Sequence, residues 1–181
     1  AGESNLTPTL TAPVLASLAV ASVTASPDIV IYCDGSCTNN GKPDARAGYG
    51  MYVTRDKAEV YAHSGRIPPS EPQTNQRAEL TALFHALQYA GESGHVAHIY
   101  TDSRYGMDCL TKWAPTWEQS GWRKTDKKPI QHLDLIQPMY ELYKTIQSNV
   151  QIKHIEGHMG HHGNTEADRL ARHGAGDLRD G

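Results

Sequence analysis

Residues 29–34 read IVIYCD, a short run of β-branched and apolar residues that ends in an aspartate. Such a run is typical of a buried strand. A second run of the same kind, HIYTD, occupies residues 98–102. Because ligands of open α/β sheets gather at the carboxyl ends of strands, Asp34 and Asp102 indicate a site at one edge of a sheet.

The turn residues that separate these runs, and the order of the runs along the chain, predict a mixed sheet with helices on its faces. The predicted strands span residues 29–33, 48–53, 60–67, 96–101 and 150–155, of which the first three form an antiparallel meander. Thr74 or Asn75 can cap a helix whose apolar residues continue to Leu87. Further helices are predicted over residues 103–112 and 135–146, with Pro138 tolerable only near a first turn. Asn164 can cap a last helix, which ends near Gly174 or Gly176.

The chain divides into three parts by composition. Residues 1–27 hold one charge and no helical or strand period, and we expect a flexible leader or linker. Their apolar centre resembles a signal-peptide core without the basic residues before it, so organelle or secretory targeting stays open. Residues 28–176 have the length of one ordinary domain, and residues 177–181 form a tail.

The bulk charge and the cysteines limit the class of protein. A net charge of −3 does not fit a protein held on nucleic acid by overall charge. No apolar run approaches the roughly 20 residues of a membrane span. The odd number of cysteines, three, favours a reducing compartment, so we expect an intracellular protein of the cytoplasm or nucleus. Cys33 and Cys37 could still pair, although a buried Cys33 is the preferred interpretation.

Two further acids accompany the strand-end aspartates. Glu79 falls in the opening turns of its predicted helix, and Asp168 stands among apolar residues early in the last helix. Four clustered carboxylates would repel one another unless cations compensated them, and hard oxygen ligands suit Mg²⁺ or Mn²⁺. Two such ions about 3.5–4 Å apart can activate water and stabilise a leaving oxygen at phosphorus.

The local sequences around these acids resemble those of type 1 ribonuclease H from about Asp28 to Ala175. The matching blocks, in family order, are YCDGSC (32–37), NG (40–41), AGYG (47–50), TNQRAEL (74–80), YTDS (100–103), GHMG (157–160), GN (163–164) and EADRLA (166–171). The resemblance implies the ribonuclease H-like α/β fold, with three antiparallel strands followed by parallel ones. It also implies endonucleolytic cleavage of the RNA strand of RNA–DNA hybrids, giving 5′-phosphate and 3′-hydroxyl ends.

The same resemblance implies roles for residues of the catalytic centre. Asp34, Glu79, Asp102 and Asp168 correspond to four carboxylates that hold two Mg²⁺ ions, with Mn²⁺ as a substitute. His158 corresponds to a loop histidine that assists proton transfer or product release, which suits a neutral imidazole near pH 7.

Contacts with the hybrid are implied residue by residue. Positions that touch the RNA strand and can read 2′-hydroxyls are Cys37, Asn40, Asn75 and Gln76. Thr74 corresponds to part of a pocket for a DNA phosphate. Pro72 and His132 stand where some relatives have an arginine and an asparagine, so we expect the contact with the DNA strand to differ in detail from theirs.

A stretch from Lys112 to Lys128 adds the basic patch that the whole chain lacks. It holds five Lys or Arg against two acids, a balance of +3, and resembles the basic protrusion of the family. The binding residues implied there are Trp113, Trp117, Lys124, Lys127 and Lys128. The tryptophans could equally support the core, and the cations could belong to an ordinary solvated loop.

The sequence leaves several alternatives open. Four histidines between His154 and His162 could suggest zinc, although the usual ligand spacing is missing. A module that binds hybrids without cutting them is disfavoured, because all four acids are present. A ribonuclease H domain of a reverse transcriptase polyprotein stays open, because the chain begins without Met. We expect a monomer, with a further upstream domain possible in the full-length protein.

Overall fold

The computed structural model describes residues 26–156 and 161–177. Within them, one sheet has the strand order β3-β2-β1-β4-β5. Its strands are β1 (Ile29–Thr38), β2 (Arg46–Arg55), β3 (Ala58–Arg66), β4 (Ala97–Thr101) and β5 (Val150–His154). The first three strands pair antiparallel, whereas β4 joins β1, and β5 joins β4, in parallel. The predicted fold class is confirmed.

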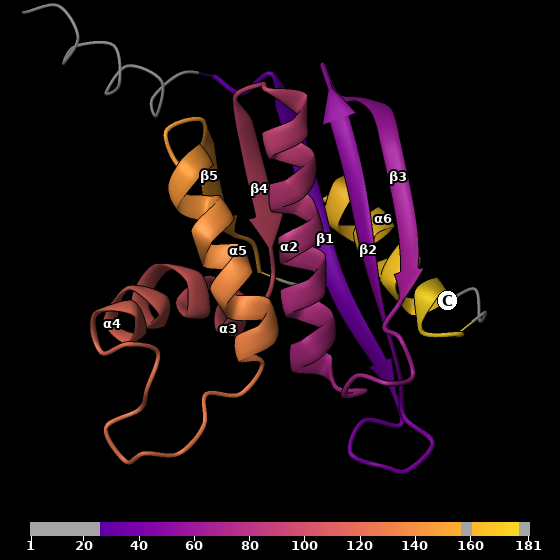
Figure 1. The fold of residues 1–181 in the computed structure, drawn as a ribbon. Helices are drawn as coiled ribbons and strands as arrows, with labels where there is room; N and C mark the ends of the chain where they lie inside the picture. The colour runs from indigo at the N-terminus through magenta and orange to yellow at the C-terminus, as the bar shows by residue number, and fades with distance from the viewer. Residues whose placement is uncertain (1–25, 157–160, 178–181) are drawn as a thin grey trace, which may run out of the picture.

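Helices cover both faces of this sheet. Figure 1 shows α2 (Asn75–Ser93) and α5 (Leu133–Ile146) on one side and α6 (His162–Gly174) on the other. The Thr74 hydroxyl accepts a hydrogen bond from the Arg77 N–H at 3.1 Å, which caps α2. The fully buried leucines 80, 83 and 87 hold α2 against the sheet, as their spacing predicted.

The first strand is longer than its apolar run. β1 continues to Thr38, so Asp34 lies within the strand rather than at its end, contrary to the prediction. The parallel pairing with β4 nevertheless stops at Cys33, opposite Thr101. Beyond Cys33, β1 goes on only as the antiparallel partner of β2, a hairpin pairing that the apolar pattern does not reveal.

The helical region after β4 is also longer than predicted. It runs as α3 (Arg104–Asp108), a π-helical turn (Cys109–Trp113) and α4 (Ala114–Gln119). The π turn has more residues per turn than an α-helix and shifts the side-chain period in mid-helix. This shift puts α4 out of phase with α3, so no single helical period runs through residues 104–119.

Two predicted helix starts are wrong. α6 begins at His162 rather than after Asn164, which is only 9% exposed inside the helix. Gly163 lies so close to the Tyr32 ring that a Cβ would be 2.2 Å from it, so the first turn of α6 packs tightly on β1. α5 begins at Leu133, after His132 turns the chain at φ 58°, so Pro138 lies in the second turn.

No helix among the described residues is long and apolar enough to cross a membrane.

Candidate active site

Strand register brings the two aspartates together. Because Cys33 lies opposite Thr101 in parallel strands, the next residues, Asp34 and Asp102, leave the paired region side by side. Asp34 is only 4% exposed, and its Oδ1 accepts a hydrogen bond from the Gly35 N–H at 2.9 Å. This hydrogen bond holds the Asp34 carboxylate on β1, the middle strand of the sheet.

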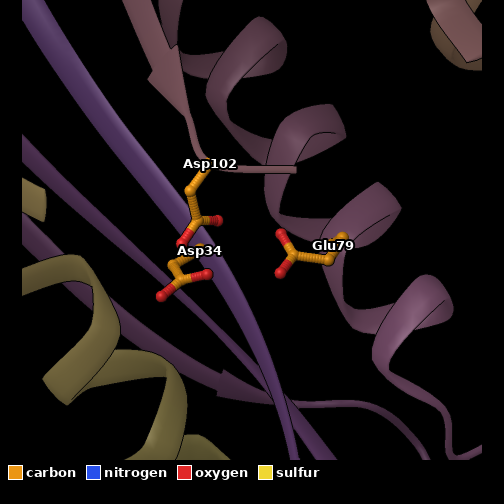
Figure 2. Close-up of side chains that lie close together, drawn as sticks. All are labelled: Asp34, Glu79 and Asp102. Carbon is orange, nitrogen blue, oxygen red and sulfur yellow. The ribbon is translucent and has the colours of Figure 1, made fainter. Parts of the chain in front are cut away.

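A glycine brings the third acid onto them. A Cβ at Gly35 would lie 2.4 Å from the backbone nitrogen of Glu79, so only glycine lets α2 approach β1 this closely. The close approach sets Glu79 beside the two aspartates. Figure 2 shows the three carboxyl groups pointing toward one another from β1, α2 and the end of β4.

These three side chains form a compact acidic cluster. One oxygen from each of Asp34, Glu79 and Asp102 lies within 4.8 Å of the others. Burial, followed by the charges of Glu79 and Asp102, raises the pKa of Asp34 far above its usual range. Burial and the charge of Asp102 likewise raise the pKa of Glu79. The cluster is costly in the absence of a compensating positive charge.

One atom of the cluster points to that missing charge. Glu79 Oε2 is a buried side-chain oxygen without a hydrogen-bond partner among the described residues. A buried polar atom of this kind costs free energy unless a ligand satisfies it. A divalent cation with oxygen ligands fits both this atom and the surrounding carboxylates.

Asp168 lies at the margin of the cluster. Its charge contributes to the raised pKa of Asp34, yet it is not among the three acids whose oxygens converge. Its side chain is 47% exposed and forms an ion pair with Arg172 one turn later, at 3.0 Å. The structure therefore brings three of the four predicted acids together and leaves the fourth beside them.

The structure does not describe the predicted histidine. His158 lies in residues 157–160, outside the described part of the chain.

Comparison with known proteins shows to which family the chain belongs. The RNase H family model matches residues 26–176. The chain belongs to the RNase H family. Ribonuclease H of Schizosaccharomyces pombe is 36% identical over 86% of this chain and 56% of its own length. Ribonuclease H1 of Mus musculus is 37% identical over 84% of this chain and 52% of its own length. The chain thus spans about half the length of these two relatives.

Other relatives match over nearly their whole length. Ribonuclease H of Cupriavidus necator is 36% identical over 81% of this chain and 94% of its own. The solved PFV RNase H domain superposes with a TM-score of 0.72 at 26% identity, covering 84% of this chain and 97% of that one. LC9-RNase H1, a type 1 RNase H, has a TM-score of 0.61 at 28% identity, covering 86% and 75%. These similarities identify the chain as a type 1 RNase H.

The residues predicted to touch RNA gather where β1 meets the start of α2 in this RNase H. Asn40 Oδ1 accepts a hydrogen bond from the Asn75 backbone at 3.3 Å, and both residues are exposed. Gln76, also exposed, lines a cavity of about 570 Å³ together with Thr74. Cys37 is partly buried, with Sγ 3.5 Å from the Gln73 carbonyl oxygen.

The tryptophans of the basic stretch divide between surface and core. Trp113 is 39% exposed, lies 6.1 Å from Trp117 between ring centroids, and lines a cavity of about 260 Å³ with it and Lys124. Trp122 packs edge-on against the nearly buried Tyr140. Trp113 and Trp117 are therefore available to a ligand, while Trp117 and Trp122 also pack against the core.

The basic triad, which consists of Lys124, Lys127 and Lys128, surrounds a second cavity of about 640 Å³ with Arg123. Lys127 and Lys128 are exposed, and Asp126 accepts a hydrogen bond from the Lys128 backbone at 3.0 Å. This group of cations faces solvent beside the aromatic cavity, and Lys124 lines both.

All three cysteines are free, and Cys33 is buried. The preferred interpretation over a disulfide is thereby confirmed. Among the described residues, the group of metal-ligating side chains that converges is the acidic cluster and contains no histidine.

Sequence reasoning missed a buried arginine. Arg77 is 3% exposed and donates to both carboxylate oxygens of Asp134, at 2.8 and 2.6 Å, and to Glu71 Oε1. The pKa of Asp134 is lowered mainly by this hydrogen bonding. These contacts tie the start of α2 to the start of α5. A signal was available, because Arg77 stands on the apolar face of α2, one turn before Leu80 and Thr81.

Proposed function

We propose that this RNase H hydrolyses the RNA strand of RNA–DNA hybrids as an endonuclease, leaving 5′-phosphate and 3′-hydroxyl ends. The observation that carries the proposal is the convergence of Asp34, Glu79 and Asp102, with a buried, unpartnered oxygen on Glu79. Relatives named ribonuclease H or ribonuclease H1 are 36–37% identical over 81–86% of this chain and support it.

Carboxylates with this degree of burial and mutual repulsion suit divalent cations. Asp34, Glu79, Asp102 and Asp168 would hold two Mg²⁺ ions, with Mn²⁺ as a substitute. Once bound, the ions supply activation of the attacking water and stabilisation of the leaving oxygen. The exposed, arginine-paired Asp168 can exchange partners more readily than the buried Asp34.

The remaining residues of the centre bind, orient and move protons. The Gly35 N–H fixes one carboxylate oxygen of Asp34 and so orients the group that would hold a cation. His158 would move a proton near the scissile phosphate or ease product release. Side chains at the start of α2 and near the end of β1 would read the 2′-hydroxyls of RNA: the partly buried Cys37 and the exposed Asn40, Asn75 and Gln76.

The DNA strand would lie along the aromatic and basic surface. Trp113 and Trp117 offer rings for sugar and base contacts, and the basic triad offers phosphate contacts. Thr74 would meet a DNA phosphate. Its cavity is also lined by Pro72 and His132, and Arg77 within it is already paired with two carboxylates.

The molecular context completes the proposal. Residues 28–176 would form the catalytic domain of a monomer, with residues 1–27 as leader and 177–181 as tail. The three free cysteines support an intracellular location, in the cytoplasm or nucleus. Identity is 36% to a ribonuclease H of nearly this domain's length and 25% to the protease–reverse transcriptase of Prototype Foamy Virus. The viral RNase H domain superposes with a TM-score of 0.72 and LC9-RNase H1 with 0.61, so a polyprotein domain is kept as the second candidate.

A substrate panel tests the proposal. Labelled RNA–DNA, RNA–RNA and DNA–DNA duplexes of one sequence are incubated with the protein, with Mg²⁺ or with EDTA. We expect cleavage of the hybrid alone, only with metal, and none by Asp102→Asn. Asp56→Asn removes the same charge from an exposed turn and should cleave like wild type. Equal cleavage by Asp102→Asn, or of RNA–RNA, would overturn the proposal.

A further inference from the structure

His154 joins the last strand to the turn that carries Asp102. It is the final residue of β5 and lies opposite Thr101, the residue before Asp102. Its ring nitrogen Nε2 is 3.2 Å from the backbone carbonyl oxygen of Asp102. The contact reaches the backbone of a clustered acid without touching its carboxylate.

The cap of α3 leaves that carbonyl open to the histidine. In a regular helix the Gly106 N–H would donate to the carbonyl four residues earlier, which is that of Asp102. Here the Gly106 N–H donates to the Ser103 hydroxyl instead, at 3.0 Å. The Ser103 N–H in turn donates to the Thr101 hydroxyl at 3.1 Å. The turn after β4 is therefore held by the two hydrogen bonds of Ser103 and, from the neighbouring strand β5, by His154.

Arg104 sets which nitrogen of the ring carries the hydrogen. Its Nη2 lies 3.4 Å from His154 Nδ1. A guanidinium group only donates, so Nδ1 must accept. The hydrogen of the neutral ring is then on Nε2, which can donate to the Asp102 carbonyl. The two contacts agree on one tautomer and form a chain from Arg104 through His154 to Asp102.

We propose that His154 is a positioning residue for Asp102 and that Arg104 holds its ring in the donating tautomer. Fixing the Asp102 carbonyl fixes the backbone from which the carboxylate projects toward Asp34 and Glu79. Loss of the bond lets the turn relax and moves one cation ligand away from the other two. The inference rests on the proposed function in one respect, that Asp102 helps to hold a divalent cation.

Metal binding without substrate gives the readout. Mn²⁺ affinity is measured by calorimetry, and the rise in melting temperature with Mn²⁺ is measured beside it. Interactions that orient metal ligands typically affect affinity by about 10- to 100-fold, so we expect His154→Leu to weaken Mn²⁺ binding by about tenfold. His154→Gln keeps an N–H near the Nε2 position and should restore most of it. His98→Leu, a histidine of the neighbouring strand, is the matched control and should bind like wild type.

A double-mutant test separates positioning from general stability. Arg104 is exposed, so Arg104→Met should fold and should weaken Mn²⁺ binding by about threefold. In the His154→Gln background the same change should have no effect, because an amide has no tautomer to hold. A merely structural role would lower the metal-free melting temperature of every variant and would not show this dependence on background.

Unchanged Mn²⁺ affinity in both His154→Leu and Arg104→Met would overturn the inference, as would an equal loss for Arg104→Met in both backgrounds. If His154→Leu does not fold, the arginine variant in the two backgrounds still decides. The cleavage assay is independent of these results. Wild-type cleavage with no effect of His154 on metal binding refutes the inference alone, whereas metal binding that depends on His154 without cleavage refutes the proposed function alone.

Discussion

Asp34→Asn should stabilise the metal-free protein, even though it removes a buried side chain's native charge. The Gly35 N–H donates to Asp34 Oδ1, and an asparagine can keep this bond through its own Oδ1. The substitution removes the negative charge of Asp34, which lies close to the carboxyl groups of Glu79 and Asp102. One oxygen from each of the three groups lies within 4.8 Å of the others. The variant therefore loses repulsion and keeps its local contact.

The size of the effect follows from Coulomb's law. Two unit charges about 5 Å apart repel by about 3 kcal/mol at an effective dielectric constant of 20. Because the pKa values of Asp34 and Glu79 are raised, part of the cluster is protonated near neutral pH and this figure is an upper one. We expect a gain of about 1–3 kcal/mol, which for a domain of this size raises the melting temperature by roughly 2–4 °C per kcal/mol.

The effect should depend on pH in a defined direction. Carboxyl groups with raised pKa values hold protons in the folded state that the unfolded state has released. The metal-free protein therefore loses stability as pH rises above the ordinary carboxyl pKa of about 4. The gap between Asp34→Asn and wild type should be largest near pH 8 and shrink toward pH 5. Histidines with lowered pKa values, such as His85 and His98, affect both proteins equally and cancel in the difference.

Thermal denaturation in EDTA from pH 5 to 8.5 measures this gap, with Asp56→Asn as the control that removes an exposed charge. Added Mg²⁺ should raise the melting temperature of wild type more than that of Asp34→Asn. A variant that melts clearly below wild type at pH 8, or a gap that does not change with pH, would refute the view that the three carboxylates repel one another.

Three further predictions concern the substrate surface, the loop histidine and the buried arginine. Changing the basic triad to glutamine should raise KM more than it lowers kcat. Each lost phosphate contact should reduce the slope of log affinity against log salt concentration by about 0.9. An unchanged slope would show that the triad does not contact phosphates. His158→Ala should slow turnover by about 10²–10⁴-fold, whereas Glu79→Gln should abolish it. If single-turnover assays find both variants equally inactive, the proton-transfer role of His158 is contradicted. Arg77→Met should lower the free energy of unfolding, measured by urea titration, by about 2–3 kcal/mol, because charge-assisted hydrogen bonds are lost. A variant as stable as wild type would show that the contacts between α2 and α5 are dispensable.

Local sequence predicted the elements that local rules govern. The β-rich runs before Asp34 and Asp102 identified two neighbouring strands, and the capped apolar spacing identified α2. The convergence of these acids followed from the family resemblance. Its geometric cause, the glycine at position 35 that admits Glu79, becomes visible only when α2 packs on β1.

Tertiary contacts decided what the sequence could not. The Arg77–Asp134 ion pair joins helices whose starts are 58 residues apart by number, and no local pattern encodes that pairing. His154 was noticed only as a possible zinc ligand, because its contact with Asp102 depends on the register of β4 and β5. The start of α6 lies earlier than the sequence predicted, and Gly163 in its first turn packs against Tyr32, a strand residue distant in sequence.

The most direct test of the central claim uses one RNA–DNA hybrid with a different label on each strand. With Mg²⁺, the account predicts internal fragments of the RNA strand that end in 3′-hydroxyl groups, an intact DNA strand, and no product from Asp34→Asn. Cleavage in EDTA, cleavage of the DNA strand, or fragments from Asp34→Asn at the wild-type rate would contradict it.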